Sequence, residues 1–201
     1  MEKTLKPALR FKGFTDTWEQ HELSDVMVSH NAGVYISKDK YGEGTNIIGV
    51  GDIYNGDVVN GEIYRLAPVK DDKFLLNKDD LIYGESSLVP EGIARTMYVD
   101  ENGAGTAFAW HTRRVEVDTT KVNAHLLTLQ INYSYKSRNH LMRVSTQTAL
   151  TGMTTEGYFS TPITYPSLEE QQKISSVFTE LDKLITLHQR KYDKLVNIKK
   201  A

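Results

Sequence analysis

Amide, aromatic and basic side chains alternate in the segment from Asn132 to Gln147, and side chains of these types can bind nucleic acid. Residues 132–140 read Asn-Tyr-Ser-Tyr-Lys-Ser-Arg-Asn-His, and no acidic residue follows until Glu156. Arginine and lysine bind phosphates and guanine edges, whereas asparagine and glutamine can bind adenine through two hydrogen bonds. The segment therefore indicates a DNA-binding surface, although a solvent-exposed loop after a helix has the same composition.

Motifs for catalysis or metal binding are weak. Gly49-Val50-Gly51 lacks the third glycine and the following helix of a dinucleotide site, and no Walker-type phosphate loop occurs. Asp71 and Lys73 have the spacing of a nuclease metal site, but the upstream Pro-Asp is missing. The Asp/Asn-Pro-Pro-Tyr/Phe motif of amino-methyltransferases and the Gly-x-Ser-x-Gly elbow are also missing. Scattered histidines and the lack of cysteine offer no metal site, so we expect no catalytic or metal-ligating residue.

Charge is unevenly distributed along the 201 residues, whose net charge is −2. Residues 1–101 hold 11 Lys/Arg against 18 Asp/Glu, so the first half is acidic. Residues 102–155 form a basic block, whose cations are Arg113, Arg114, Lys121, Lys136, Arg138 and Arg143. A basic block inside an acidic chain is expected of a phosphate-binding face, and equally of a solvated face.

Composition is ordinary for a globular intracellular protein. No apolar run approaches the length of a membrane span, and the charged N-terminus lacks the apolar segment of a signal peptide. Without cysteine the chain has no disulfides. We therefore expect a cytoplasmic protein without a membrane partner.

Short strands dominate the elements that would position these residues. We expect an N-terminal arm over residues 7–17, a short element over 18–27 and a polar loop over 29–45. Strands are predicted at Asn46–Ile53, Val58–Leu66, Phe74–Leu76, Leu81–Tyr83, Ala94–Val99, Ala107–Trp110, Val115–Val117 and near Tyr158–Ile163. Apolar residues three or four apart predict a helix over 123–135, followed by a polar basic segment. Many strands before few helices favour a mixed, strand-rich α+β domain.

A long helix is predicted from Ser167 to the end of the chain. Pro166 restrains the backbone ahead of it, Ser167 is a good N-cap, and Glu170 would complete a capping box. Neither glycine nor proline occurs after Pro166, so at 1.5 Å per residue the helix would be roughly 50 Å long.

Apolar residues form a regular seam along this helix, with a period of seven residues that is typical of coiled coils. The seam consists of Ile174, Val177, Phe178, Leu181, Leu184, Ile185, His188, Tyr192, Leu195 and Ile198. One interpretation is a helix folded back on its own domain; the other is a protruding coiled-coil arm that pairs with another helix. His188 is better explained as a polar residue that sets the register than as a metal ligand.

The start of the terminal helix and several shorter motifs form a recognisable set. Residues 166–171, Pro-Ser-Leu-Glu-Glu-Gln, follow a strand and lead into Ile174, Leu181-Asp182 and Leu184-Ile185. Shorter matches are Leu9-Arg10-Phe11, Gly13-Phe14, Trp18, Gly51-Asp52-Ile53 and Asp80-Leu81-Ile82-Tyr83. With this set the chain resembles one half of the specificity subunits of Type I restriction–modification systems, and the resemblance spans nearly its whole length.

The resemblance implies a target-recognition domain over residues 1–166 and a conserved helical spacer over 167–201. Members of the family are not catalytic. They direct methyltransferase subunits, which use S-adenosylmethionine, and a restriction subunit, which uses ATP and Mg²⁺, to a bipartite target in double-stranded DNA. No cofactor is then expected on this chain itself.

Full-length members carry two recognition domains and two spacer helices that pair antiparallel, whereas this chain has one of each. We expect two copies to pair through the seam from Ile174 to Ile198 in an isologous dimer. The alternative is that the chain is one half of a longer subunit, with which its abrupt end at Ala201 is compatible.

If the resemblance holds, we expect three segments to contact DNA: residues 37–41, the turn at 86–87, and residues 135–154. The candidate residues are Ser37, Lys38, Lys40, Tyr41, Ser86, Ser87, Tyr135, Lys136, Arg138, Asn139, Arg143, Thr146, Gln147, Thr148, Thr151 and Thr154. Two other functions stay open: an interaction module that docks through its terminal helix without binding DNA, and the recognition part of a nuclease or methyltransferase.

Overall fold

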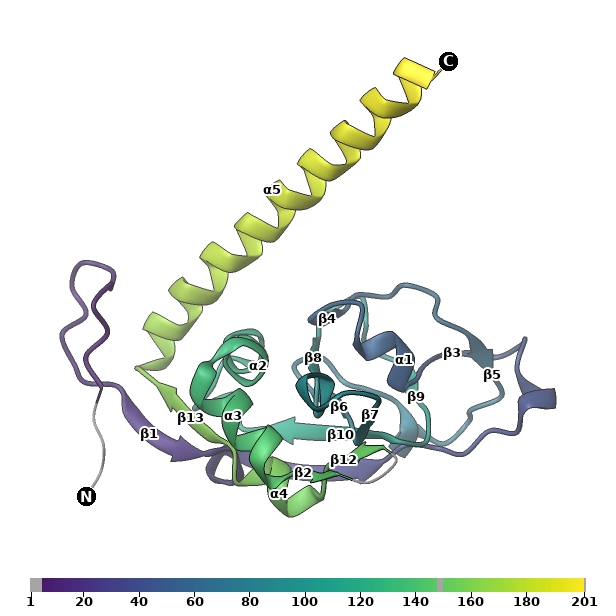
Figure 1. Ribbon diagram of the computed structural model, residues 1–201, viewed down its shortest axis with the longest axis horizontal. Helices are drawn as coiled ribbons and strands as arrows, with labels where there is room; N and C mark the ends of the chain where they lie inside the picture. Colours follow the sequence, from purple (N-terminus) through teal and green to yellow (C-terminus); the bar gives the residue numbers. More distant parts are fainter. Residues whose placement is uncertain (1–4, 148–149, 201) are drawn as a thin grey trace.

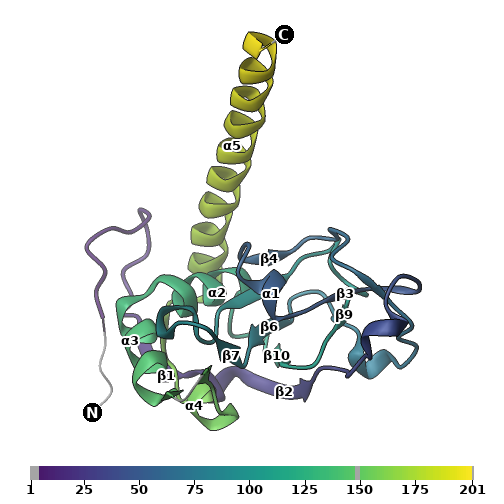
Figure 2. The same cartoon turned by 45° about the vertical axis from the view of Figure 1, so that its right-hand side comes forward.

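A strand-rich α+β domain and one long projecting helix make up the computed structural model, which describes residues 5–147 and 150–200 (Figure 1). The C-terminal helix α5 (Leu168–Lys200) leaves one end of the domain and points away from it in both views (Figures 1 and 2). The mixed fold class predicted from the sequence is confirmed. Among the described residues, no helix is long and apolar enough to cross a membrane.

A five-stranded sheet with the order β2-β10-β6-β8-β4 forms the centre of the domain. Strands β2, β10, β6 and β8 pair antiparallel, and β4 is added in parallel to β8 at the edge. Their bounds are β2 Met27–Ala32, β4 Val58–Val59, β6 Leu81–Gly84, β8 Thr96–Val99 and β10 Thr112–Val117.

Both faces of the central sheet are covered. Along β6, Leu81 and Tyr83 belong to one hydrophobic cluster, whereas Ile82 between them belongs to another. This alternation follows from the two-residue period of a strand, and all three side chains are at most 1% exposed. Helices α2 and α4 contribute Leu127, Ile131 and Tyr158 to the first cluster. The helix α1 and the strands around it contribute Ile48, Ile53 and Phe108 to the second.

Three smaller sheets surround the central one. They are β1-β13, β5-β3-β9 and β11-β12-β7. Their strands are β1 Glu19–Glu22, β3 Thr45–Ile48, β5 Leu66–Ala67, β7 Ser86–Ser87, β9 Ala107–Phe108, β11 Thr146–Gln147, β12 Thr151–Gly152 and β13 Pro162–Tyr165. The helices are α1 Val50–Ile53, α2 Ala124–Tyr133, α3 Tyr135–Val144, α4 Thr155–Phe159 and α5 Leu168–Lys200, with 3-10 turns at Leu23–Val26, Lys38–Lys40, Asp72–Phe74 and Pro90–Gly92.

Most predicted strands differ in extent from the observed ones, and in three of them a helix, a turn or an irregular segment takes the place of part of the strand. The strand predicted over 46–53 ends at Ile48, because the Asp52 carboxylate accepts the Gly49 N–H at 2.7 Å and starts the single-turn helix α1. Residues 60–65, predicted as part of one strand, separate β4 from β5. There the Asn46 side chain bonds the backbone of Glu62 and Tyr64, which replaces strand pairing. Residues 72–74 form a 3-10 turn ahead of Leu75.

Two helical segments were also missed. The polar segment after α2 was interpreted as a loop, but residues 135–144 form α3, because Ser134 is extended and its hydroxyl accepts the Ser137 N–H. The strand predicted near 158–163 begins only at Pro162. Thr154 caps the short helix α4 ahead of it by accepting the Gly157 N–H at 3.0 Å. Caps that consist of one hydroxyl leave little trace in the apolar pattern.

Helix α5 begins at Leu168, as the sequence predicted, but half of its capping box differs. The Ser167 hydroxyl accepts the Glu170 N–H at 3.5 Å. The Glu170 carboxylate takes the guanidinium of Arg10 as its partner, at 2.9 and 2.5 Å, instead of reaching back to the Ser167 N–H. The capping carboxylate is thus used to attach the N-terminal arm to the root of the helix.

Buried polar groups fix the root of α5 to α2. Gln171 accepts the Asn123 N–H at 2.9 Å and donates to the Lys121 carbonyl at 2.8 Å. One turn further on, Ser175 bonds His125 Nδ1 at 2.9 Å. Burial lowers the pKa of His125, against the opposing pull of nearby carboxylates. The direction of the helix is therefore set over its first two turns.

Candidate nucleic-acid interface

A small three-stranded sheet brings two of the predicted DNA-contacting segments together. Thr151 and Gly152 of β12 pair with Ser87 and Ser86 of β7 on one side, and with Thr146 and Gln147 of β11 on the other. Ser87 and Thr151 are buried at 5% and 6% exposure, whereas Thr146 is exposed. The buried side chains of Ser87 and Thr151 position the backbone of the sheet, so a ligand would contact the exposed Thr146.

The third predicted segment, residues 37–41, forms a 3-10 turn at the end of the domain far from α5 (Figure 1). Lys38 and Lys40 are exposed, Ser37 is partly buried, and Tyr41 packs under the guanidinium of Arg65. Tyr41 lines the same concavity as Ser86 of β7. All three predicted segments are thus connected, two through the sheet and two through this concavity.

The candidate residues of α3 point in different directions. Tyr135 is 82% exposed, Asn139 is partly buried, and Lys136 hydrogen-bonds Gln20. Arg138 turns inward and donates to the Glu91 carbonyl at 2.7 Å, and burial lowers its pKa. Arg143 is exposed and makes no ion pair or hydrogen bond within the described part of the chain. Of these, Arg143 is the cation best placed for a phosphate or base.

The remaining candidate residues lie in the second half of the predicted DNA-contacting segment 135–154. Thr154 is exposed, but its hydroxyl caps α4. Gln147 is placed by its strand pairing with Thr151. Thr148 lies outside the described residues.

Much of the basic block serves the fold. Arg114 is 8% exposed and forms an ion pair with the buried Asp80 at 2.6 Å, and burial raises the pKa of that carboxyl despite the guanidinium. Arg113 bonds Glu85 at 2.5 Å, and Lys121 pairs with Asp118. The excess positive charge of the block is therefore smaller at the surface than the sequence indicates.

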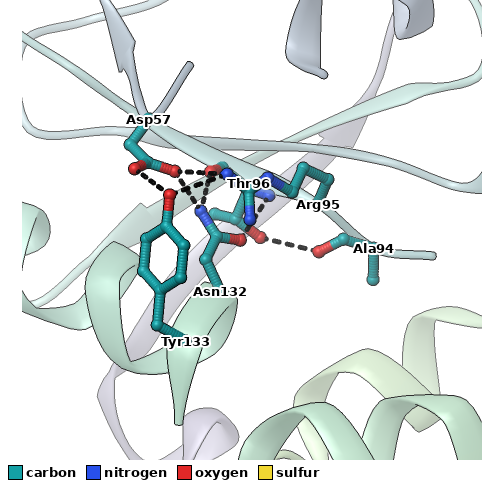
Figure 3. Close-up of polar contacts among 6 residues, drawn as sticks. All are labelled: Asp57, Ala94, Arg95, Thr96, Asn132 and Tyr133. Atoms are coloured by element: carbon teal, nitrogen blue, oxygen red, sulfur yellow. Dashed lines mark hydrogen bonds and ion pairs between the residues drawn. The ribbon is translucent and has the colours of Figure 1, made fainter. Parts of the chain in front are cut away.

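The amide and aromatic groups that begin the segment are also used internally. Asn132 is 4% exposed and its side chain bonds both the N–H and the carbonyl of Thr96 (Figure 3). Asp57 accepts from Asn132 at 2.7 Å, from Tyr133 at 2.6 Å and from Arg95 at 3.1 Å. This network ties the end of α2 to β8 and to the start of β4. Asn132 and Tyr133 are structural residues in this chain.

Sequence reasoning missed a pair of exposed aromatic rings beside the concavity. Tyr35 and Trp110 are 65% and 52% exposed and lie edge to face, with ring centroids 5.1 Å apart. The one signal in the sequence was a tryptophan at the predicted end of a strand. Within residues 5–147 and 150–200, no group of three or more His, Asp or Glu side chains could hold a metal ion.

Only the first part of the predicted seam along α5 lies close to the domain, among the residues that the structure describes. Ile174 is partly buried, and Val177 and Phe178 face a groove beside Leu9 and Phe11 of the N-terminal arm. From Leu181 onward every seam residue is exposed, with Leu184 at 51% and Ile198 at 65%. From Leu181 onward the seam is not folded back onto the domain, and pairing in a coiled coil stays a prediction.

Comparisons with solved structures identify the fold. One chain, from a study of complex assembly and conformational transition of the type I R-M system, is 13% identical, with a TM-score of 0.62, and is matched over 93% of this chain and 43% of its own length. The HsdS subunit from Thermoanaerobacter tengcongensis is 14% identical, with a TM-score of 0.58 over 93% and 42%. The S subunit of M. genitalium is 12% identical, with a TM-score of 0.57 over 89% and 42%.

The chain therefore spans less than half the length of the solved chains it matches. No curated protein sequence matches it. The model of the Type I restriction modification DNA specificity domain matches residues 15–197, which include the domain and most of α5. The chain belongs to the family of Type I restriction–modification DNA specificity domains.

Proposed function

We propose that this chain recognises one half of a split DNA target, as the specificity subunit or half subunit of a Type I restriction–modification system. The observation that carries the proposal is the family match over residues 15–197. The fold supports it, because β7, β11 and β12 bring two of the three predicted DNA-contacting segments into one sheet.

The proposed partners are double-stranded DNA, methyltransferase subunits and a restriction subunit, all in the cytoplasm. In this proposal the chain binds no cofactor and catalyses no reaction. S-adenosylmethionine, ATP and Mg²⁺ belong to the partner subunits, and the chain contributes the position on DNA at which they act.

Helix α5 is proposed to act as the spacer. Its 33 residues would measure roughly 50 Å at 1.5 Å per residue. Its seam would pair either with α5 of a second copy or with the corresponding helix of a second half. Two copies related by a twofold axis would read an inverted repeat with an unread gap.

Methylome sequencing of cells that express this chain with its cognate methyltransferase subunits tests the proposal. We expect methylated adenine in a split motif, which is palindromic if two copies pair. Expression of the methyltransferase subunits alone is the control. Absence of new methylation, with the complex intact, would contradict DNA recognition and favour an interaction module.

Individual contacts can be tested by comparing two arginines of α3. Arg143 is exposed and has no ion pair or hydrogen bond among the described residues. If it reads a base, its replacement by Ala is expected to weaken target binding by about 1–3 kcal/mol in a titration at fixed salt. Arg138 donates to the Glu91 carbonyl, so R138A is the matched control for loss of charge in the same helix. Unchanged affinity of R143A would remove Arg143 from the interface.

A further inference from the structure

An aromatic concavity lies at the end of the domain far from the root of α5. Its volume is about 450 Å³, and its walls include Tyr35, Trp110, Val50 and Arg65. Trp110 lies between two rings: it meets Tyr35 edge to face at 5.1 Å and stacks on His111 at 4.9 Å. Trp110 is therefore held in place by its neighbours although half of its surface faces solvent.

The backbone next to Trp110 is strained. His111 has φ +68°, in the left-handed region that a side chain other than glycine rarely adopts. The residue is kept there by both its backbone and its ring. The His111 carbonyl accepts the Glu85 N–H at 3.0 Å, and Nδ1 lies 3.1 Å from the Glu85 carboxylate. Strain that the surroundings enforce gathers at ligand-binding sites, and here it fixes the turn that presents Trp110.

Two of the predicted DNA-contacting segments border this concavity. Tyr41 and Ser86 belong to the segments 37–41 and 86–87, and both line its wall. Arg65 is 49% exposed, lies over the Tyr41 ring at 5.5 Å and pairs with Asp52 at 3.1 Å. A half-exposed guanidinium at the rim of an aromatic surface is suited to a phosphate or a guanine edge.

The chemistry of the walls selects among the features that DNA presents. In the major groove, base edges carry hydrogen-bond donors and acceptors, and the only apolar group among them is the 5-methyl of thymine. Tyr35 and Trp110 offer ring carbons, and Val50 adds an aliphatic side chain. The ring carbons of Tyr35 and Trp110 would leave a polar base edge without partners but would bury a methyl group favourably.

We propose that Tyr35 and Trp110 are specificity-determining residues that contact the 5-methyl group of a thymine in the target, and that Arg65 binds the DNA beside it. This inference rests on the proposed function, since it assigns a base contact to the same recognition domain. It adds a contact that comes from the turn after β9 and from the segment after β2, outside the three segments predicted from the sequence.

Deoxyuridine, which differs from thymidine by the methyl group alone, provides the test. After the methylome has given the target, the chain in complex with its methyltransferase subunits is titrated at fixed salt against duplexes in which each thymine is replaced in turn. We expect one replacement to weaken binding about fourfold, the contribution of one buried methylene-sized group. The same replacement is expected to have no effect on W110A and little on Y35A, whose affinities for the thymine duplex are already lower.

Control variants separate the contact from general damage. W110F keeps an aromatic surface and is expected to retain part of the discrimination, and I63A removes a side chain that is 77% exposed outside the concavity and should match the unmodified chain. For Arg65, R65Q is expected to weaken binding and to reduce the salt dependence by about one phosphate contact. K78Q removes another exposed, ion-paired cation and should change neither the affinity for DNA nor its salt dependence.

Two results would overturn the inference while leaving the proposed function intact. One is a methylated target whose affinity is unchanged by every deoxyuridine replacement. The other is a W110A complex with unchanged melting temperature and the same loss on replacement as the unmodified chain. Absence of sequence-specific methylation by the unmodified complex would overturn both. If W110A does not fold, Y35A and the duplex series still decide the matter.

Discussion

Apolar side chains are buried in the central sheet but exposed along most of helix α5. In β6, Leu81, Ile82 and Tyr83 are each at most 1% exposed, because packed layers cover both faces. In α5, Leu184 and Ile198 are 51% and 65% exposed. Burial of apolar surface stabilises folding at about 25 cal/mol per Å². The domain gains this term within the described residues, whereas the exposed part of the helix would gain it only by binding a partner.

The largest effect is expected inside the domain, at the buried ion pair of Arg114 and Asp80. R114L would leave the Asp80 carboxylate buried without its cation, and we expect the free energy of unfolding to fall by about 3–5 kcal/mol. Urea denaturation measures this. R113L, which removes a cation of the same strand that is 29% exposed, should cost much less. An equal fall in the free energy of unfolding for R114L and R113L would show that burial does not distinguish the two arginines.

On the helix, a charge in the seam should affect assembly and spare the domain. L184D would place an unpaired carboxylate in the proposed helix pair, and we expect self-association to weaken roughly a hundredfold, or by about 3 kcal/mol. Light scattering over a range of concentrations measures the mass. R190D alters charge on the opposite face, since Arg190 is exposed and lies two residues, or about 200° around the helix, from the seam residue His188, and it should leave the mass unchanged. A single-chain mass for the unmodified protein at high micromolar concentration would contradict pairing of two copies.

At the junction of the two regions, Gln171 should have an intermediate effect. It is 1% exposed and satisfies the Asn123 N–H and the Lys121 carbonyl. Q171A would leave both without that partner, so we expect a loss of about 1–3 kcal/mol in the free energy of unfolding and faster amide exchange at the root of α5. Q172A, at the exposed neighbouring position, is the control. If both variants exchange alike, the root is not held by this side chain.

The smallest effect expected is a pH dependence at the same junction. Burial lowers the pKa of His125 in the folded state, so the unfolded chain binds its proton more readily. The resulting stability is present above the ordinary histidine pKa of about 6.5 and is lost as pH falls toward the lower folded-state pKa. H125N should flatten this slope in melting curves between about pH 7.5 and 5.5. His140, whose pKa burial also lowers, would retain a slope of the same sign, so the slope should shrink and not vanish.

The sequence predicted the long helix well, but it did not predict which of the proposed DNA-contacting residues have partners inside the fold. A seven-residue apolar repeat without glycine or proline identifies α5 by itself, since helical spacing is a local property. The use of Arg138 and Asn132 could not be foreseen, because both residue types bind DNA as readily as they bind Glu91 or Thr96. Which partner they take depends on elements about 36 to 47 residues away in the chain. The aromatic pair was missed for the same reason, since Tyr35 and Trp110 meet only in the folded domain.

The pairing of the chain's first strand with its last has a consequence for the order of folding. Strand β1 pairs with β13, Arg10 forms an ion pair with Glu170, and the Asn123 N–H donates to the Gln171 side chain. Contacts between residues so far apart in sequence form slowly, because a long stretch of chain must first be closed into a loop. During synthesis, β1 therefore stays without its neighbour until β13 has left the ribosome, and Arg10 and Asn123 stay without these partners until the first turn of α5 follows. The strand-rich domain is therefore completed only after the first turn of α5 has been synthesised.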